Sequence, residues 1–114
     1  MMRKKSRLFM QAAHEARKSS QRCRHGAILL YRNKVVSRGY NRCYAQRRNG
    51  WLSRHAEIDA LVRSRRLGQD MVMIVVRIDR EENVRNSKPC KRCQKSLARC
   101  GIRVYYSTDD EEKK

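Results

Sequence analysis

The sequence has one proline, one tryptophan and one phenylalanine in 114 residues, and it has no long apolar run. Its two longest apolar stretches, AILLY and MVMIVV, are far shorter than the ~20 residues that a membrane-spanning helix needs. The basic N-terminal segment also lacks the continuous apolar centre of a secretory signal peptide, although its amphipathic pattern leaves a transit peptide open. We therefore expect no membrane partner, no secretion, and a cytoplasmic or nuclear location.

The cysteines do not form the even set that a disulfide framework requires. There are five of them, and an odd count is rare among secreted disulfide-stabilised domains. In the absence of an export signal, this count favours a reducing compartment.

Acidic residues are scarce. Eleven Asp and Glu face 29 Lys and Arg, which gives a formal net charge of +18, and four of the acids lie together at 109–112. A field of this sign attracts polyanions, so we expect a nucleic-acid partner. The alternatives are a basic surface that serves only solubility and a ribosome-associated protein.

The apolar spacing predicts one α/β layer domain over residues 1–114, with 108–114 as a disordered tail. Helical spacing predicts a first helix over about 5–19, and alternating or continuous apolar runs predict the strands. The polar, arginine-rich stretch at 42–54 has no apolar period and is expected to be a loop. The remaining predicted elements are strands at 25–31, 35–41, 71–78 and 102–107, and helices at 55–66 and 89–99.

A CxxC motif, Cys90 and Cys93, stands directly behind the single proline, Pro89. Alone it fits a redox pair, half of a structural zinc site or half of a catalytic one. His55 opens the preceding predicted helix, and two helices that follow neighbouring strands can present their first turns at one sheet edge. The three side chains can then meet around one metal. Two thiolates and an imidazole suit zinc, and three protein ligands leave one position open for water.

Glu57 completes the pattern H-x-E…P-C-x-x-C, which is typical of zinc deaminases. On this pattern, the chain resembles the cytidine and deoxycytidylate deaminase superfamily from about 24 to 107. The quoted segments are RHGAILLYRNKVVSRGYNR, HAEIDAL, SKPCKRC and GIRVYYS. The resemblance implies a three-layer α/β/α fold with a mixed four-stranded sheet, without the family's usual last helix and strand.

The resemblance also implies roles for individual residues. His55, Cys90 and Cys93 would bind one zinc ion, and Glu57 would carry protons between water, the ring nitrogen and the leaving amine. Cytosine would become uracil, with release of ammonia. A closed structural site with Cys43 or another cysteine as fourth ligand is the alternative, and it would not need the glutamate.

Further residues are expected to contact the substrate. The family pattern assigns such contacts to Asn41 and to the Ala56 backbone amide. From its place beside the expected pocket, Trp51 is a candidate for stacking on a base. The candidate basic contacts at the pocket mouth are Arg24, Arg47 and Arg48.

Many arginines around a small opening favour single-stranded DNA or RNA over a free nucleotide, which carries few phosphates. The alternatives are a dCMP or CMP deaminase, a tRNA adenosine deaminase, and a catalytically silent nucleic-acid-binding module. The last predicted strand would leave an exposed sheet edge, and a second copy of the chain could cover it, which makes a homo-oligomer possible.

Overall fold

The computed structural model describes residues 2–20, 23–47, 50–64 and 70–108, and of residues 2–6, 43–47 and 50–54 it describes the backbone. Three helices and seven strands follow one another in the described part of the chain. They are α1 (Met2–Ala16), β1 (Arg24–Tyr31), β2 (Lys34–Tyr40), β3 (Arg42–Arg47), β4 (Gly50–Arg54), α2 (Ala56–Arg63), β5 (Met71–Ile78), β6 (Val84–Arg85), α3 (Lys91–Arg99) and β7 (Arg103–Tyr106).

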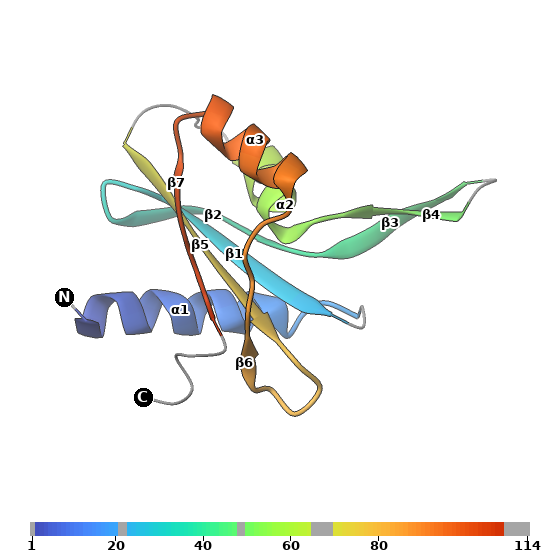
Figure 1. The fold of residues 1–114 in the computed structure, drawn as a ribbon, viewed down its shortest axis with the longest axis horizontal. Helices are drawn as coiled ribbons and strands as arrows, with labels where there is room; N and C mark the ends of the chain where they lie inside the picture. The colour runs from blue at the N-terminus through green and yellow to red at the C-terminus, as the bar shows by residue number, and fades with distance from the viewer. Residues whose placement is uncertain (1, 21–22, 48–49, 65–69, 109–114) are drawn as a thin grey trace.

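The main sheet is mixed and has the order β2-β1-β5-β6, with β7 also paired to β5 (Figure 1). β1 runs antiparallel to β2 and β5, whereas β7 runs parallel to β5 and pairs Val72 with Arg103. The crossover from β5 to β7 contains β6 and α3. Because the parallel pairing places the start of β7 beside the start of β5, α3 lies against one face of the sheet.

Both faces of the sheet are covered, which explains the unbroken apolar sequence of β5. α1 packs on one face, with Ala12 and Ala16 against Ile28 and Ile74. α2 and α3 pack on the other face, where the core residues are Ala27, Leu29, Ala56, Ala60, Met71, Met73, Val75, Leu97 and Ile102. The three-layer α/β/α prediction is confirmed (Figure 1).

Two glycines let the helices approach the sheet closely. A Cβ at Gly26 would collide with the backbone of Ala12 and Ala16 in α1, and a Cβ at Gly39 would collide with Ala60 in α2. The two glycines therefore fix helices on opposite faces of the sheet, and α2 carries part of the site described below.

The strand count predicted from sequence is wrong in two places. The main sheet has five strands, because Val84 and Arg85 pair with Ile78 and Arg77 as the short β6. The stretch 42–54, expected to be a loop, forms a second two-stranded sheet, the β3–β4 hairpin, in which Arg42 pairs with Arg54. Backbone pairing in this hairpin does not depend on an apolar period, so the sequence pattern gave no strand signal there.

The described residues do not test two further predictions, the homo-oligomer and the disordered C-terminal tail. Within the described residues, the strand that pairs with β7 is β5, and the homo-oligomer stays a prediction. The predicted tail lies outside the described residues, except for Thr108. In the part of the chain that the structure describes, no helix is both long and apolar enough to span a bilayer.

Candidate metal centre and pocket

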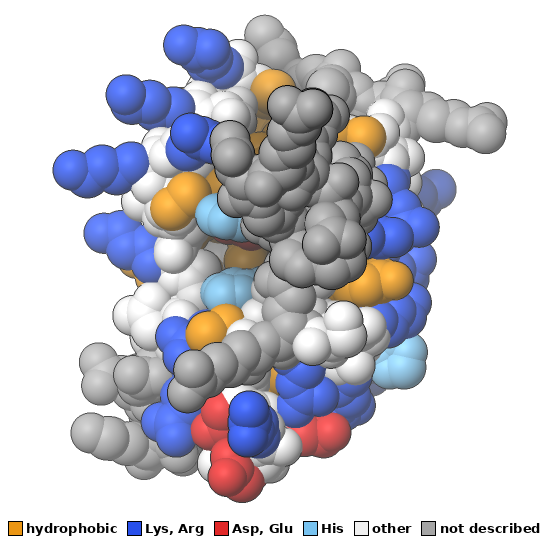
Figure 2. All heavy atoms as spheres, turned by 90° about the vertical axis from the view of Figure 1, so that its right-hand side faces the viewer, with side chains coloured by type: hydrophobic (Ala, Val, Ile, Leu, Met, Phe, Trp, Pro, Cys, Tyr) orange, Lys and Arg blue, Asp and Glu red, His pale blue; other side chains and the backbone are white. Residues whose placement is uncertain are grey.

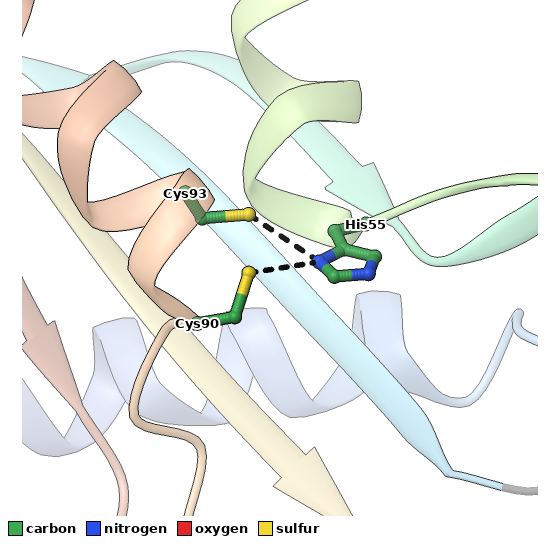
Figure 3. Close-up of side chains that lie close together, drawn as sticks. All are labelled: His55, Cys90 and Cys93. Carbon is green, nitrogen blue, oxygen red and sulfur yellow. Dashed lines mark hydrogen bonds between the residues drawn. The ribbon is translucent and has the colours of Figure 1, made fainter.

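The start of α2 and the start of α3 bring one imidazole and two thiols together (Figure 3). His55 Nδ1 lies 3.3 Å from Cys93 Sγ and 3.7 Å from Cys90 Sγ. Figure 3 shows both sulfur atoms directed at the same ring nitrogen. The three ligand atoms all lie within 4.8 Å of one another.

These separations fit a zinc ion. Tetrahedral zinc with Zn–S of about 2.3 Å and Zn–N of about 2.0 Å places sulfur and nitrogen ligands roughly 3.5 Å apart. Burial, with a contribution from the nearby Glu57 carboxylate, raises the pKa of the Cys93 thiol to about 12. A thiolate at this position therefore needs a cation beside it, and a coordinated metal supplies one.

The loop before α3 is held by a pair of buried serines. Ser87 Oγ lies 2.8 Å from Ser107 Oγ and donates to the Val75 carbonyl, also at 2.8 Å. The Ser87 N–H donates to the Ser107 carbonyl. Three residues later, Cys90 opens α3, so these bonds fix the position of the CxxC against β5 and β7.

A pocket of about 330 Å³ lies next to the three candidate ligands. Figure 2 looks onto this side of the molecule, where two histidine side chains border a hollow. The lining residues among those described are Cys23, His25, Asn41, His55, Ala56, Glu57, Lys88 and Cys90. Ala56 is the first residue of α2, and a helix's first N–H groups have no partner within the helix, so its amide can serve a ligand.

Two titratable side chains in the pocket have shifted pKa values. Burial raises the pKa of Glu57, whose side chain is 4% exposed. Burial, helped by the Arg77 guanidinium, lowers the pKa of His25 to about 4. His25 is therefore neutral at pH 7 and can donate or accept one hydrogen bond per ring nitrogen.

Asn41 is buried between the sheet and the pocket. Its Oδ1 accepts from the His25 N–H at 2.8 Å, and its Nδ2 donates to the Cys23 carbonyl at 2.6 Å. The Ser19 hydroxyl donates to the Asn41 carbonyl. Asn41 thus fixes the position of the start of β1. Its side-chain amide, which lines the pocket, is already oriented by backbone groups.

The β3–β4 hairpin is anchored next to the pocket by a buried carboxylate. Asp59 Oδ2 accepts from Arg42 Nη2 at 2.9 Å and from the Tyr40 N–H at 3.1 Å. The Arg42 guanidinium also lies 4.3 Å from the centre of the Tyr40 ring. Asp59 is fully buried in α2, so the helix that begins at His55 also holds the base of the hairpin.

Of the other residues predicted to contact the substrate, one does not line the pocket, and the side chains of three lie outside the described part of the structure. Arg24 donates to the Asp79 carbonyl at 2.6 Å and is not among the residues that line the pocket. The side chains of Trp51, Arg47 and Cys43 lie outside the described part of the structure, as does all of Arg48. The described residues bring His55, Cys90 and Cys93 together as a group that could hold a metal ion, and a fourth ligand from Cys43 stays untested.

Three residues that line the pocket were not among the predicted contacts: Lys88, Cys23 and His25. Lys88 is exposed and lines the pocket, and its place two residues before Cys90 was the available signal. Cys23 also lines the pocket, although we predicted no role for it there. Nothing local marked Cys23, because β1 brings it there through the fold.

The comparisons agree with the geometry. The sequence matches the profile of the cytidine and deoxycytidylate deaminase zinc-binding region over residues 2–108. No curated protein matches the sequence.

Solved structures with the same fold include a dCMP deaminase from the cyanophage S-TIM5, with a TM-score of 0.70 at 23% identity, covering 91% of this chain and 82% of that one. The same enzyme in complex with dCMP and dUMP matches with a TM-score of 0.64 at 22% identity, covering 90% and 79% of the two chains. A cytidine deaminase from Burkholderia pseudomallei has a TM-score of 0.63 at 20% identity, covering 84% and 76%.

Proposed function

Because the chain belongs to the cytidine and deoxycytidylate deaminase family and is a zinc-dependent deaminase, we propose that it converts cytosine to uracil within single-stranded nucleic acid. The reaction adds one water to the base and releases one ammonia. His55, Cys90 and Cys93 would hold the zinc, and the pocket beside them would receive the base.

A bound zinc supplies Lewis-acid activation of water at neutral pH. Glu57 provides the proton transfers. Its carboxyl group lies in the pocket two residues after His55, and no other acidic side chain is among the described lining residues. It takes the two protons of the attacking water in turn, giving the first to the ring nitrogen of cytosine and the second to the departing amine.

The walls of the pocket orient the base. The Ala56 amide and the Asn41 side chain line the pocket and offer polar groups to the base, and neutral His25 adds a third. Because Asn41 is held by the Cys23 carbonyl and the His25 amide, its orientation is set before substrate arrives.

The observation that carries the polynucleotide proposal is the position of the β3–β4 hairpin. Asn41 directly precedes this hairpin and His55 directly follows it, and both line the pocket. The hairpin projects well beyond the body of the molecule (Figure 1). Its sequence carries Arg42, Arg47, Arg48 and Arg54 and no acid. A free nucleotide reaches no farther than the pocket, whereas a strand extends past it and offers a phosphate at every step.

A free-nucleotide activity is the second candidate, supported by the pocket volume of about 330 Å³ and by Lys88 at its lining. One structure of similar fold is a dCMP deaminase that binds dCMP and dUMP. In this reading Lys88 meets the single phosphate of the nucleotide, and the basic hairpin contributes solubility.

One assay separates the candidates. Purified zinc-loaded protein is given dCMP, cytidine, a cytosine-containing single strand of DNA or of RNA, and tRNA, with Glu57→Gln as the matched inactive control. We expect uracil in the strands, with apparent affinity that falls steeply with salt. Efficient turnover of dCMP without turnover of any strand would replace this proposal by the second candidate, and inosine in tRNA would replace cytosine by adenine as the base.

A further inference from the structure

Helix α3 exposes one strongly basic face. Its apolar side is limited to Cys93 and Leu97, which are buried against the sheet. The opposite side exposes four cations, Lys91, Arg92, Lys95 and Arg99, together called the α3 cation track. The helix contains no acidic residue.

Within the described residues, no ion pair involves a member of the track. Two cations elsewhere do have partners: Arg17 pairs with Glu82 at 3.1 Å, and Arg85 pairs with Asp79 at 3.0 Å. Figure 2 shows lysine and arginine side chains projecting along one edge of the pocket face and acidic side chains gathered at its lower end. The track therefore presents positive charge that the described part of the protein does not neutralise.

The cations of the track form a row along α3, and the row begins beside the pocket. Arg92, Lys95, Ser96 and Arg99 line one open hollow of about 340 Å³. These positions recur about once per helical turn, so their charges repeat roughly every 5.4 Å along the axis. The helix starts at Cys90, which lines the metal pocket, as does the exposed Lys88.

We propose that the α3 cation track binds the phosphodiester backbone of a single-stranded polynucleotide on one side of the cytosine in the pocket. This inference rests on the proposed function and adds a second contact region to the β3–β4 hairpin. A regular row of unpaired cations matches a regular row of phosphates, and each neutralised phosphate releases counterions. Among the described residues, the hollow is lined by cations and a serine and by no apolar side chain, so it does not fit the acyl chains of a lipid surface.

The test measures binding directly, without catalysis. A fluorescent 20-nucleotide oligouridylate and a matching trinucleotide, both free of cytosine, are titrated with zinc-loaded protein across a series of salt concentrations. The variant is Lys95→Gln with Arg99→Gln, which leaves the residues beside the zinc ligands unchanged. The control is Lys34→Gln with Arg38→Gln on β2, at the opposite edge of the sheet, which removes the same charge.

We expect the double substitution on α3 to lower the log–log salt slope for the 20-nucleotide strand by about 1.4, because each lost phosphate contact of a single strand contributes about 0.7. The control should change the slope by much less, and trinucleotide binding should change little in either variant. Zinc content and the thermal unfolding midpoint should stay at the wild-type values in both.

An equal loss of slope in the two variants would overturn the proposal, because a general effect of net charge would then explain it. Undiminished binding of the long strand would also overturn it, as would a protein that binds anionic phospholipid vesicles but no oligouridylate. Failure of the proposed function has a different signature: the strands would stay undeaminated while the slope difference between the two variants remained.

Discussion

Helices α2 and α3 begin in the same way and then diverge. The N-cap residue of each is a candidate zinc ligand: His55 (φ −67°, ψ 154°) and Cys90 (φ −67°, ψ 166°). Neither side chain makes the usual capping hydrogen bond to its own helix. Such a bond contributes about 1 kcal/mol to helix stability, and both helices lack it. The side chains of the two N-cap residues point toward each other instead.

Beyond the first turn the two helices differ in burial and charge. α2 buries two carboxyl groups, Glu57 in the pocket and Asp59 under the β3–β4 hairpin. α3 buries only Cys93 and Leu97 and exposes cations. If the proposed function holds, α2 carries out the proton transfers and anchors the β3–β4 hairpin, while the outer face of α3 remains available to a partner.

The largest expected effect concerns the feature that the helices share. Cys90→Ser removes a ligand at the start of α3, so zinc should be lost, and folding stability with it, because metal-binding energy is partly folding energy. Cys23→Ser is the matched control, since Cys23 is also exposed and lines the same pocket but lies outside the ligand group. Metal analysis and thermal unfolding measure both. Zinc kept in Cys90→Ser but lost in Cys43→Ser would show that the ligand set is wrong.

The next effect isolates the chemistry of α2. Glu57→Gln keeps the shape of the side chain and should keep the zinc and the fold, whereas turnover should fall by at least about 10²–10⁴-fold, because acid–base transfer is removed. Turnover and zinc content are measured on one preparation. A fully metallated Glu57→Gln with wild-type turnover would remove Glu57 from the mechanism.

The positions of His55 and the CxxC at two helix starts could be predicted from the sequence because helix starts are set locally. His55 and the CxxC each stand at the start of a helix, and helix starts are marked by local residues such as Pro89. The strand at 71–78 was predicted with its observed bounds, since an unbroken apolar run has few alternative structures. The fold class follows from the same periodicities.

Contacts between distant segments could not be predicted in this way. The Asp59–Arg42 pair joins residues 17 apart, and the Ser87–Ser107 pair joins residues 20 apart, so each depends on sheet register and helix placement. The sequence of the β3–β4 hairpin contains one signal for a turn, the Asn49-Gly50 dipeptide, which is typical of tight hairpin turns. The arginine-rich residues around this dipeptide show no apolar alternation, so the two strands of the hairpin could not be predicted from it.

A smaller effect tests the structural role of α2. Asp59→Ala should lower the free energy of unfolding by about 3 kcal/mol, the low end of the range for breaking a buried ion pair, because Arg42 keeps some contact with water. Urea unfolding of the zinc-loaded protein measures the loss. Glu81→Ala, at an exposed position, is the control and should change stability little. Equal losses in the two variants would contradict the anchoring role of Asp59.

The smallest effect concerns Lys88, which lines the pocket two residues before Cys90, the N-cap residue of α3. If its ammonium group meets a substrate phosphate, Lys88→Gln should raise KM for dCMP about two- to fivefold at low salt and leave kcat unchanged, because an exposed ionic contact contributes little and is screened. Deoxycytidine, which has no phosphate, is the matched substrate, and its KM should not change. Lys34→Gln controls for net charge. An equal rise in KM for dCMP and deoxycytidine would assign Lys88 to the shape of the pocket, and the phosphate contact would then have to come from the β3–β4 hairpin or from α3.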